Sequence, residues 1–180
     1  KGTVLHRGSE DCTGLMLIES GRLRVFTVSD EGRELTIYHL IDRDICLFSA
    51  PCILHSVDFD VLVAVEDEAV VDIIAAPVYR QLMDTNVDVA NFTNELMASR
   101  FSDVMWLFDQ VMNRRIDARL AALLVEECDQ EGSSVLSVTH EQLGNHLGSP
   151  REVVTRMLKY LQTEGLVKLG RGSIEIVDEA

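Results

Sequence analysis

Two arginines and a glutamate in the last third of the chain are residue types that can read DNA. Arg151 and Glu152 are adjacent, and Arg156 follows one turn later if the stretch is helical. Arginine can bind O6 and N7 of guanine with two hydrogen bonds, and glutamate can accept one from N4 of cytosine. Each such contact discriminates against a wrong base by about 1–3 kcal/mol. The stretch therefore predicts contacts with base edges.

Two helices and a tight turn would present these side chains, and residues 138–167 contain the signals for both. Thr139 and Gln142 form a capping box at the start of the first helix, and Gly148 can end it in the left-handed conformation. Ser149 is predicted to cap the second helix, with Pro150 at its first position and a second capping box completed three residues after Ser149. The local sequence thus predicts a helix–turn–helix.

The second helix has an apolar face at Val154, Met157, Leu158 and Leu161, so its charged residues lie outward. The following "GLVKLGRGSIEIVD" predicts a hairpin, which makes the unit a winged helix. The predicted DNA contacts are Thr139, Ser149, Arg151, Glu152, Thr155, Arg156, Lys159, Lys168 and Arg171. The alternative is that this helix–turn–helix is purely structural and its charges form an ordinary solvated face.

The distribution of charge supports contact with a polyanion. The chain has a net charge of -14, but residues 138–172 hold five Lys or Arg against three acids. Residues 1–137 hold 11 Lys or Arg against 24 acids. One small basic segment beside an acidic remainder is compatible with a local footprint on nucleic acid, although the excess alone is too small to decide.

The first half of the chain predicts β-structure. "GLMLIESGRLRVFTV" contains two apolar runs joined by Ser20-Gly21, which is a two-residue hairpin signal. Residues Asp30 to Gly32 predict a second turn of this kind between the next two runs. "VLVAVEDEAVVDII" adds two β-branched runs around an acidic turn. Short strands at regular spacing predict a sandwich or small barrel.

A long helix is predicted over 87–112, after a helical start at Pro77, because the stretch has no Pro or Gly. Apolar residues at spacings of 4, 3, 4 and 3 form a coiled-coil seam that predicts a dimer interface. The seam consists of Met97, Phe101, Val104, Phe108 and Val111. The alternative is a core helix of a monomer. Another amphipathic helix is predicted over 113–128, with the domain boundary near 113–115.

Several classes of protein are disfavoured. The chain has no Gly-rich phosphate loop, no GxSxG and no HExxH, so we expect neither an enzyme nor a metal site. It has no run of 18 apolar residues, so we expect no membrane span. The first residues resemble no signal peptide and read as a chain starting within a strand. Four scattered cysteines without a CxxC pair suggest a reducing, cytoplasmic setting.

The order of elements resembles the Crp/Fnr family of bacterial transcription regulators over nearly the whole chain. "KGTVLHRGSEDCTGLMLIESGRLRVF" is similar to the family's opening strands, and "VTHEQLGNHLGSPREVVTRMLKYLQTEGLV" to its DNA-binding signature. The resemblance implies an α+β fold: an N-terminal double-stranded β-helix, a cupin-like and cNMP-binding-like jelly roll, at 1–86; a dimerisation helix at 87–112; and a C-terminal winged helix–turn–helix at 113–180. It implies a homodimer on a palindrome of TGTGA-like half-sites, with RNA polymerase as a partner.

The sequence departs from the cyclic-nucleotide members of that family. They carry a Gly-Glu pair followed by an Arg-Ser or Arg-Thr pair, and this chain has no Gly-Glu pair there and no arginine between Arg43 and Arg80. A buried cyclic phosphate without a cation would be poorly solvated, and Asp58 and Asp60 would repel it. We therefore expect that the protein does not bind cyclic AMP.

We expect an unidentified small-molecule effector in a pocket between the β-roll and the long helix, and a protein that has lost ligand control is the alternative. The candidate pocket residues are Val104, Met105, Cys46 and Cys52. Alternatives are a redox- or metal-responsive regulator acting through Cys46 and Cys52 with Cys12, and a protein-interaction module without specific DNA binding. An Fe–S cluster is not favoured, because the family's clustered N-terminal cysteines are not present. Haem at His39 or His55 is not favoured either. The redox alternative competes with a simpler interpretation, in which Cys46 and Cys52 are small buried hydrophobic residues, as free cysteines usually are.

Overall fold

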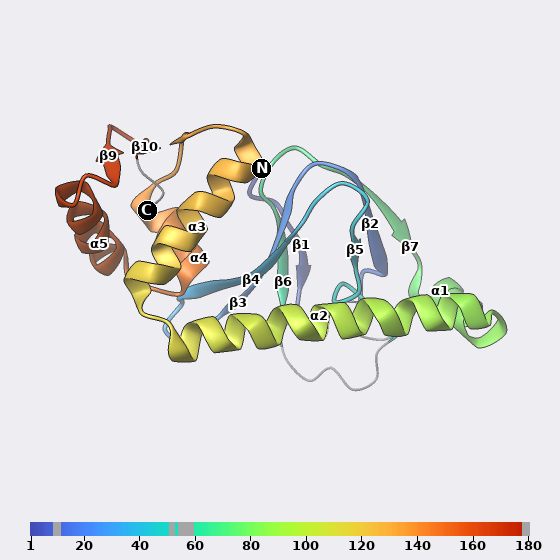
Figure 1. Cartoon of the computed structure of the whole chain (residues 1–180). Helices are drawn as coiled ribbons and strands as arrows, with labels where there is room; N and C mark the ends of the chain where they lie inside the picture. Colours follow the sequence, from blue (N-terminus) through green and yellow to red (C-terminus); the bar gives the residue numbers. More distant parts are fainter. Residues whose placement is uncertain (9–11, 51–52, 54–59, 178–180) are drawn as a thin grey trace. The chain divides into compact units, whose positions relative to one another are not determined.

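The computed structural model describes residues 1–8, 12–50, 53 and 60–177, so Cys52, His55 and Asp58 lie outside the described residues. The chain divides into two compact units (Figure 1). The first comprises residues 1–28 and 36–107, and the second comprises residues 29–35 and 108–180. The fold is α+β, with β-sheets in the N-terminal part, a long helix, and a C-terminal helix–turn–helix.

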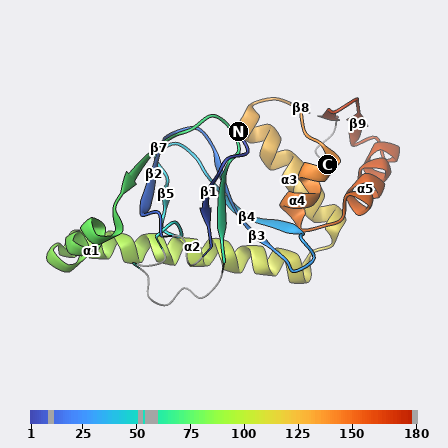
Figure 2. The ribbon, with the colours of Figure 1, turned by 180° about the vertical axis from the view of Figure 1, so that it is seen from behind.

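Two antiparallel sheets form the β-roll (Figures 1 and 2). The four-stranded sheet has the order β1 (Val4–Arg7), β6 (Leu62–Val65), β3 (Leu23–Val28), β4 (Glu34–Leu40). The three-stranded sheet has the order β5 (Ile45–Cys46), β2 (Leu15–Ser20), β7 (Val70–Ile74). Alternate residues of both sheets point inward, and the buried cluster between them includes Leu23, Val25, Leu40 and Val63.

The hairpin predicted at Ser20-Gly21 is wrong. Strand β2 pairs with β5 and β7, whereas β3 pairs with β6, so this turn carries the chain from one sheet to the other. Gly21 has a φ of 97°, and a Cβ there would overlap the backbone of Glu68 and Ala69. The two connections that change sheet therefore pass against each other, and only glycine fits at the crossing. The second predicted turn, after β3, does connect neighbouring strands β3 and β4.

Helices α1 (Ala76–Thr85) and α2 (Val87–Asn113) follow the β-roll. Pro77 lies in the first turn of α1, as the sequence predicts. The Asn86 side chain caps α2, because its Oδ1 accepts from the backbone N–H of Asp88 at 2.9 Å. The Tyr79 hydroxyl lies 2.7 Å from Oγ1 of Thr93, which itself donates to the carbonyl of Val89. These bonds, with apolar packing of α2 against Leu15 and Leu47, position α2 in the first unit.

The second unit contains a small sheet and three helices. Its elements are α3 (Ile116–Glu131), β8 (Val135–Leu136), α4 (His140–Leu147), α5 (Arg151–Thr163), β9 (Val167–Leu169) and β10 (Ile174–Ile176). The antiparallel sheet has the order β8-β10-β9, so the predicted hairpin is present as β9 and β10. The core consists of residues from all of these elements, including Leu120, Leu143, Leu158 and Ile174.

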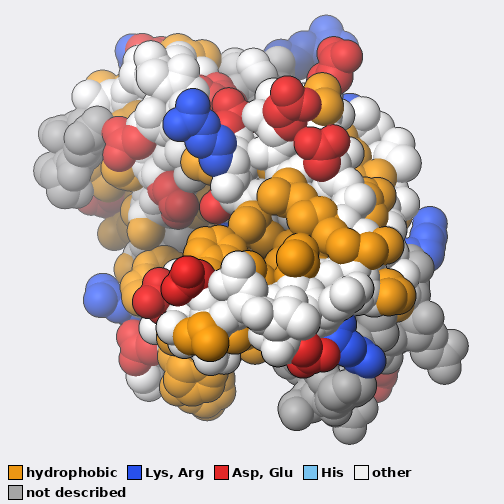
Figure 3. All heavy atoms as spheres, turned by 90° about the vertical axis from the view of Figure 1, so that its right-hand side faces the viewer, with side chains coloured by type: hydrophobic (Ala, Val, Ile, Leu, Met, Phe, Trp, Pro, Cys, Tyr) orange, Lys and Arg blue, Asp and Glu red, His pale blue; other side chains and the backbone are white. Residues whose placement is uncertain are grey.

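Apolar side chains are exposed on β7 and α1 of the first unit. Val70 and Ile73 of the edge strand β7 and Val78 and Leu82 of α1 each expose two fifths or more of their surface. Figure 3 views the side on which α1 and β7 lie, and hydrophobic side chains gather there. In the part of the chain that the structure describes, no helix combines the length and the apolar character needed to cross a membrane.

Candidate nucleic-acid interface

Helix α4 begins and ends as the sequence predicts. Thr139 Oγ1 accepts from the backbone N–H of Gln142 at 3.2 Å, and Gln142 Oε1 accepts from the backbone N–H of Thr139 at 2.9 Å. Gly148 ends the helix with a φ of 63°, and its N–H donates to the carbonyl of Gly144. The capping box and the left-handed glycine confirm the boundaries of the first helix of the motif.

The predicted cap of α5 is wrong. Pro150, not Ser149, is the N-cap residue, and no side chain caps this helix. Pro150 has a ψ of 141°, so its backbone is extended and the helix begins at Arg151. Ser149 instead donates its backbone N–H to the carbonyl of Gly144 at 2.9 Å, which closes the turn. The carbonyl of Pro150 accepts from the backbone N–H groups of Val153 and Val154 at 3.0 and 3.2 Å. Arg151 and Glu152 are exposed, so water can satisfy the N–H groups of the first turn and no side-chain cap is needed.

Gly144 determines how closely the turn approaches α4. A Cβ at this position would lie 2.6 Å from the carbonyl oxygen of Ser149, which is closer than side-chain carbons pack. The glycine is buried inside a helix, where it is otherwise unfavourable by about 1 kcal/mol relative to alanine. Its place is therefore explained by the close approach of the turn rather than by helix formation.

The outward side chains of α5 form a surface that we call the reading face: Arg151, Glu152, Thr155 and Arg156. Arg151, Glu152 and Arg156 are exposed, and Thr155 is half-buried. The opposite side of α5 is held by Val154, Leu158 and Leu161, all buried in the core of the second unit. Lys159 is exposed one turn after Thr155. The helix thus exposes two guanidinium groups and a carboxylate near its N-terminus.

The wing follows α5 directly. Lys168 on β9 and Arg171 at the tip are both exposed. The tip is closed by a bond from the backbone N–H of Gly170 to the carbonyl of Ser173 at 2.8 Å. Lys168 Nζ lies 3.6 Å from Glu175 Oε1 in an exposed ion pair, which costs little to break. Both cations are therefore available to phosphates.

Two features of this unit have no signal in the sequence. Arg119 on α3 donates from Nη2 to the carbonyl of Leu147 at 2.9 Å, which binds the C-terminal end of α4. Burial lowers the pKa of Arg119. His140 Nδ1 lies 2.9 Å from Oγ1 of Thr155 and joins the first residue of α4 to the reading face. Both contacts join residues at least 15 positions apart, so no local pattern predicts them.

Along α2, the predicted seam is exposed over much of its length. Phe101 exposes 66% of its surface and Phe108 exposes 58%; Val111 is exposed, while Met97 and Val104 are half-buried. Met105 and Met112, which helical periodicity places on the same side as the two phenylalanines, are exposed as well. The sequence assigns Met105 to the effector pocket, whereas the structure places it on this outer stripe.

Under the inner side of α2, a polar cluster joins the helix to the strands. The guanidinium of Arg100 lies 4.6 Å above the ring of Tyr38, 3.5 Å from Asp44 Oδ1 and 3.1 Å from Asp103 Oδ2. The Tyr38 hydroxyl and Nε of Arg100 are buried, and neither has a hydrogen-bond partner among the described residues. Burial raises the pKa of Tyr38 well above its usual value, with the nearby Cys46 adding to the rise.

The cysteines are in different states. Cys46 is a fully buried thiol, and burial raises its pKa. Cys128 is also not disulfide-bonded. Cys12 is disulfide-bonded, in contrast to the reducing setting that the scattered cysteines suggest. The proposed redox partner Cys52 lies outside the described residues.

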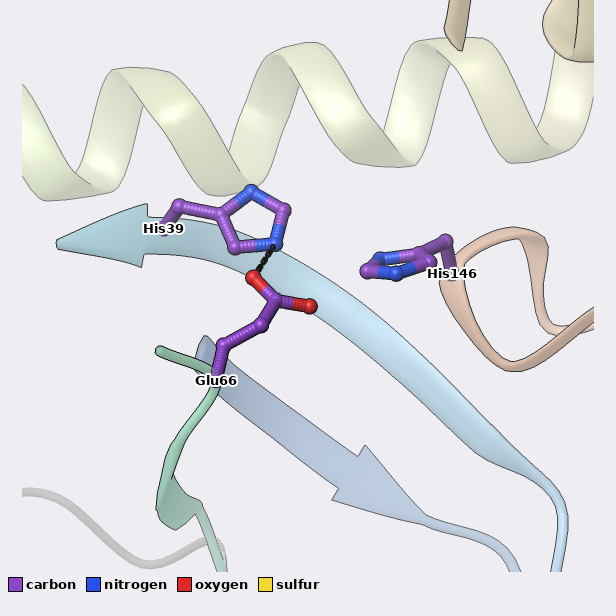
Figure 4. Close-up of side chains that lie close together, drawn as sticks. All are labelled: His39, Glu66 and His146. Carbon is purple, nitrogen blue, oxygen red and sulfur yellow. Dashed lines mark ion pairs between the residues drawn. The ribbon is translucent and has the colours of Figure 1, made fainter. Parts of the chain in front are cut away.

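His39, one of the two candidate haem ligands, already has a partner in the first unit. Its Nε2 lies 3.1 Å from Oε2 of Glu66, and the two side chains point toward each other (Figure 4). The same carboxylate oxygen lies 3.0 Å from Nε of Arg22. All three side chains are mostly buried. The arrangement explains His39 as part of an internal polar cluster with Glu66 and Arg22.

Comparisons with known proteins agree on one family. Residues 118–180 match the model of the Crp-like helix-turn-helix domain. A solved structure from Eubacterium rectale ATCC 33656, assigned as a transcriptional regulator of the Crp/Fnr family, is 54% identical, with a TM-score of 0.96, and the match covers 99% of this chain and 83% of that one. The cyclic AMP receptor protein of Thermus thermophilus is 28% identical over 167 residues, which cover 92% of this chain and 76% of the relative. The transcriptional regulator SdrP of the same organism is 30% identical over 97 residues, or 51% of this chain and 46% of SdrP.

Proposed function

The chain belongs to the Crp/Fnr family of DNA-binding transcription regulators, and we propose that it binds, as a homodimer, a palindromic site with TGTGA-like half-sites. The observation that carries this proposal is the reading face, held on a helix whose other side is buried and whose preceding turn is fixed by Gly144. Within this function, residues 1–86 sense an effector, residues 87–112 dimerise and residues 113–180 bind DNA, in the cytoplasm and with RNA polymerase as a further partner.

The predicted contacts divide by their chemistry. Arg151, Glu152 and Arg156 are exposed at the start of α5 and can hydrogen-bond to base edges in the major groove. Thr139, Ser149 and Lys159 flank them and suit phosphate contacts, which set the register of the protein on the duplex. Lys168 and Arg171 on the wing would reach the neighbouring DNA backbone.

The proposed dimer interface is the seam with its neighbours Met105 and Met112. Two exposed phenylalanines on one stripe of a long helix are unusual for a monomer, since large exposed apolar patches mark interaction sites. A second copy of the same helix offers the matching stripe, because the 4-and-3 spacing repeats along both. A two-fold dimer would also present two reading faces to the two halves of a palindrome.

The proposed effector lies near Tyr38 and Arg100 under α2, and we propose that it is not cyclic AMP. Arg100 already has two carboxylate partners, Asp44 and Asp103, so its charge is largely compensated. Any phosphate there would meet two acids as well as one cation, which is unfavourable. The Thermus relative is named a cyclic AMP receptor protein, so the expectation is a difference within the family.

DNA binding is tested by fluorescence anisotropy with a TGTGA palindrome and a scrambled duplex across a salt series. The parent should bind the palindrome more tightly, and both affinities should fall with salt because counterions are released. Arg151→Ala should lose about 1–3 kcal/mol of discrimination, whereas Lys168→Ala should weaken both duplexes alike and flatten the salt dependence. Equal binding of both duplexes by the parent contradicts the proposal.

The dimer is tested by analytical ultracentrifugation of a Phe101→Glu, Phe108→Glu double variant. We expect a monomer that binds the palindrome far more weakly than the parent, because the second half-site contact is lost. Phe92→Glu is the matched control, since Phe92 is exposed on the opposite side of α2 and should leave the dimer intact. A double variant that remains dimeric would show that the interface lies elsewhere.

Cyclic AMP is tested by isothermal titration calorimetry of the parent at micromolar concentrations. We expect no binding heat beyond dilution. Saturable binding would overturn the expectation, and Arg100→Gln would then show whether this guanidinium supplies the contact.

A further inference from the structure

The hydroxyl of Thr155 is bonded differently from other hydroxyls on the helices of this chain. Four of those donate to the carbonyl four residues earlier, at distances between 2.7 and 3.1 Å: Thr85, Thr93, Ser102 and Thr163. Thr155 Oγ1 instead lies 2.9 Å from Nδ1 of His140. Such back-bonding is the usual arrangement of a helical threonine, so the exception needs another explanation.

The contact lies on the reading face itself. Thr155 is half-buried, four residues after Arg151 and directly before Arg156. His140 is half-buried at the start of α4, next to the capping residue Thr139. Helical spacing places position 155 on the same side of α5 as Arg151 and Glu152, so the hydroxyl that His140 contacts belongs to the reading face.

The state of the imidazole decides what this hydroxyl can offer. A threonine hydroxyl has one proton and two lone pairs. When His140 Nδ1 carries a proton and donates it, Thr155 accepts and keeps its own proton for a base acceptor. When Nδ1 is bare, Thr155 donates to it and presents only lone pairs, which suit the amino groups of adenine or cytosine.

The charges around His140 come from α5 and from its own helix. Burial lowers the pKa of His140 below 6.5, and the positive charges of Arg151 and Lys159 lower it further. The neighbouring charge on α4 is Glu141, which is exposed. The imidazole is therefore neutral well above pH 6.5, where Nδ1 can be either donor or acceptor, and acidification forces Nδ1 to be a donor.

We propose that His140 is a positioning residue for base reading, which sets through its hydrogen bond whether Thr155 donates to or accepts from the base that it faces. This inference rests on the proposed DNA-binding function. Protonation of His140 should shift the preference at that base toward guanine or thymine, whose major-groove edges carry oxygen acceptors at O6 and O4. DNA reading by this protein would then depend on pH at one position of the half-site.

The primary test is a double-mutant cycle on base discrimination in the full-length protein. Palindromes carrying each of the four bases at every half-site position are compared by anisotropy for the parent, His140→Leu, Thr155→Val and the double variant. We expect His140→Leu to change the preference at one position by at least about threefold, and to change nothing there when Thr155 is already valine. An equal change in both backgrounds would show that His140 acts on DNA by itself and would overturn the proposal.

The second test separates the hydrogen bond from the charge. Asparagine can hydrogen-bond from a position close to Nδ1 but does not titrate, so His140→Asn should keep discrimination at that position and lose its pH dependence. The parent is measured about one pH unit on either side of the midpoint of the His140 ring resonance, followed by NMR in the DNA complex. A preference in the parent that stays constant across this midpoint contradicts the proposal.

The outcomes also separate this inference from the function on which it rests. If the parent binds all palindromes and the scrambled duplex alike, the proposed function fails. If the parent discriminates and Arg151→Ala weakens that discrimination, but the cycle is additive, only the role of His140 fails. Circular dichroism melting checks that each variant folds, and the His140→Asn and Thr155→Val variants carry the test if His140→Leu does not.

Discussion

Thr93 in the first unit and Thr155 in the second each share a hydrogen bond with a ring-bearing side chain, but the proton is fixed in only one of them. Thr93 donates to the carbonyl of Val89 at 2.7 Å, so the Tyr79 hydroxyl must be the donor in the bond between them. Thr155 has no such backbone bond, and the tautomer of His140 decides the direction. The bonds of Thr93 hold a helix in place. The bond of Thr155 leaves the direction of proton donation undetermined at an exposed surface.

The same difference appears in how the two units assemble their polar groups. The reading face comes from six consecutive residues, and its position depends on caps and a turn within the preceding 12 residues. The cluster of Tyr38, Asp44 and Arg100 joins residues more than 50 positions apart and is largely buried. An exposed contiguous site can be read from local sequence, whereas a buried dispersed site depends on the whole fold.

The largest effect should be a difference in thiol reactivity between the units. Cys46 is fully buried with a raised pKa, whereas Cys128 on α3 is half-buried. Alkylation of Cys46 requires opening of a core, which costs about 5 kcal/mol or more, so it should be at least ~1,000-fold slower than alkylation of Cys128. Mass spectrometry of peptides after timed iodoacetamide pulses measures both rates. Similar rates would mean that the core around Cys46 opens readily and would strengthen the redox alternative.

The sign of the accompanying pH effect follows from the raised pKa. The folded state favours the protonated Cys46 thiol more than the unfolded state does, whose pKa is near 9.0. Its contribution to stability is therefore present below that pH and is lost as the pH rises further. Cys46→Ala should remove this part of the loss of stability at alkaline pH.

A core truncation tests whether the two units unfold separately. Leu158→Ala in the second unit should lower its free energy of unfolding by about 2–5 kcal/mol, because the side chain is fully buried. Trp106, the single tryptophan, lies in the first unit, so its fluorescence transition should not move while DNA binding is lost earlier. Leu40→Ala in the first unit is the matched variant and should shift the tryptophan transition. Transitions that always move together would mean one cooperative unit.

The two side-chain caps should have similar, smaller effects. Asn86→Ala removes the cap of α2 and Thr139→Ala removes the cap of α4, and each should cost about 1 kcal/mol in denaturant unfolding. Asn94→Ala, at an exposed position inside α2, is the control and should stay within about 0.5 kcal/mol. If removing a cap lowers the free energy of unfolding no more than Asn94→Ala does, that cap does not stabilise its helix.

The smallest effect is expected at Tyr38, and its size reports on the effector. The Tyr38 hydroxyl has no hydrogen-bond partner within the described residues, so Tyr38→Phe should change stability by less than about 0.5 kcal/mol. Tyr79→Phe is the matched variant and should cost about 1 kcal/mol, because its bond to Thr93 is lost. A Tyr38→Phe loss as large as that of Tyr79→Phe would mean that the hydroxyl is bound, as a tightly held effector would require.

The sequence predicted the elements that local chemistry decides. The capping box at Thr139, the left-handed Gly148 and the outward face of α5 all follow from neighbouring residues, and the structure contains each. The Ser20-Gly21 turn was mistaken for a hairpin because a Gly-containing turn does not show which strands will pair. The bond between His140 and Thr155 and the packing around Arg100 depend on tertiary structure, so no spacing in the sequence could indicate them.

Gly144 also bears on how such a regulator could acquire a new target. The approach of the turn to α4 depends on a missing methyl group and a backbone carbonyl, and neither belongs to a side chain of the reading face. Under the proposed function, replacement of Arg151 or Glu152 would therefore change the base preference without changing the position of α5 relative to α4. The backbone arrangement of α4, the turn and α5 does not depend on these side chains. DNA recognition can therefore diverge between duplicated copies of the gene while the fold stays the same.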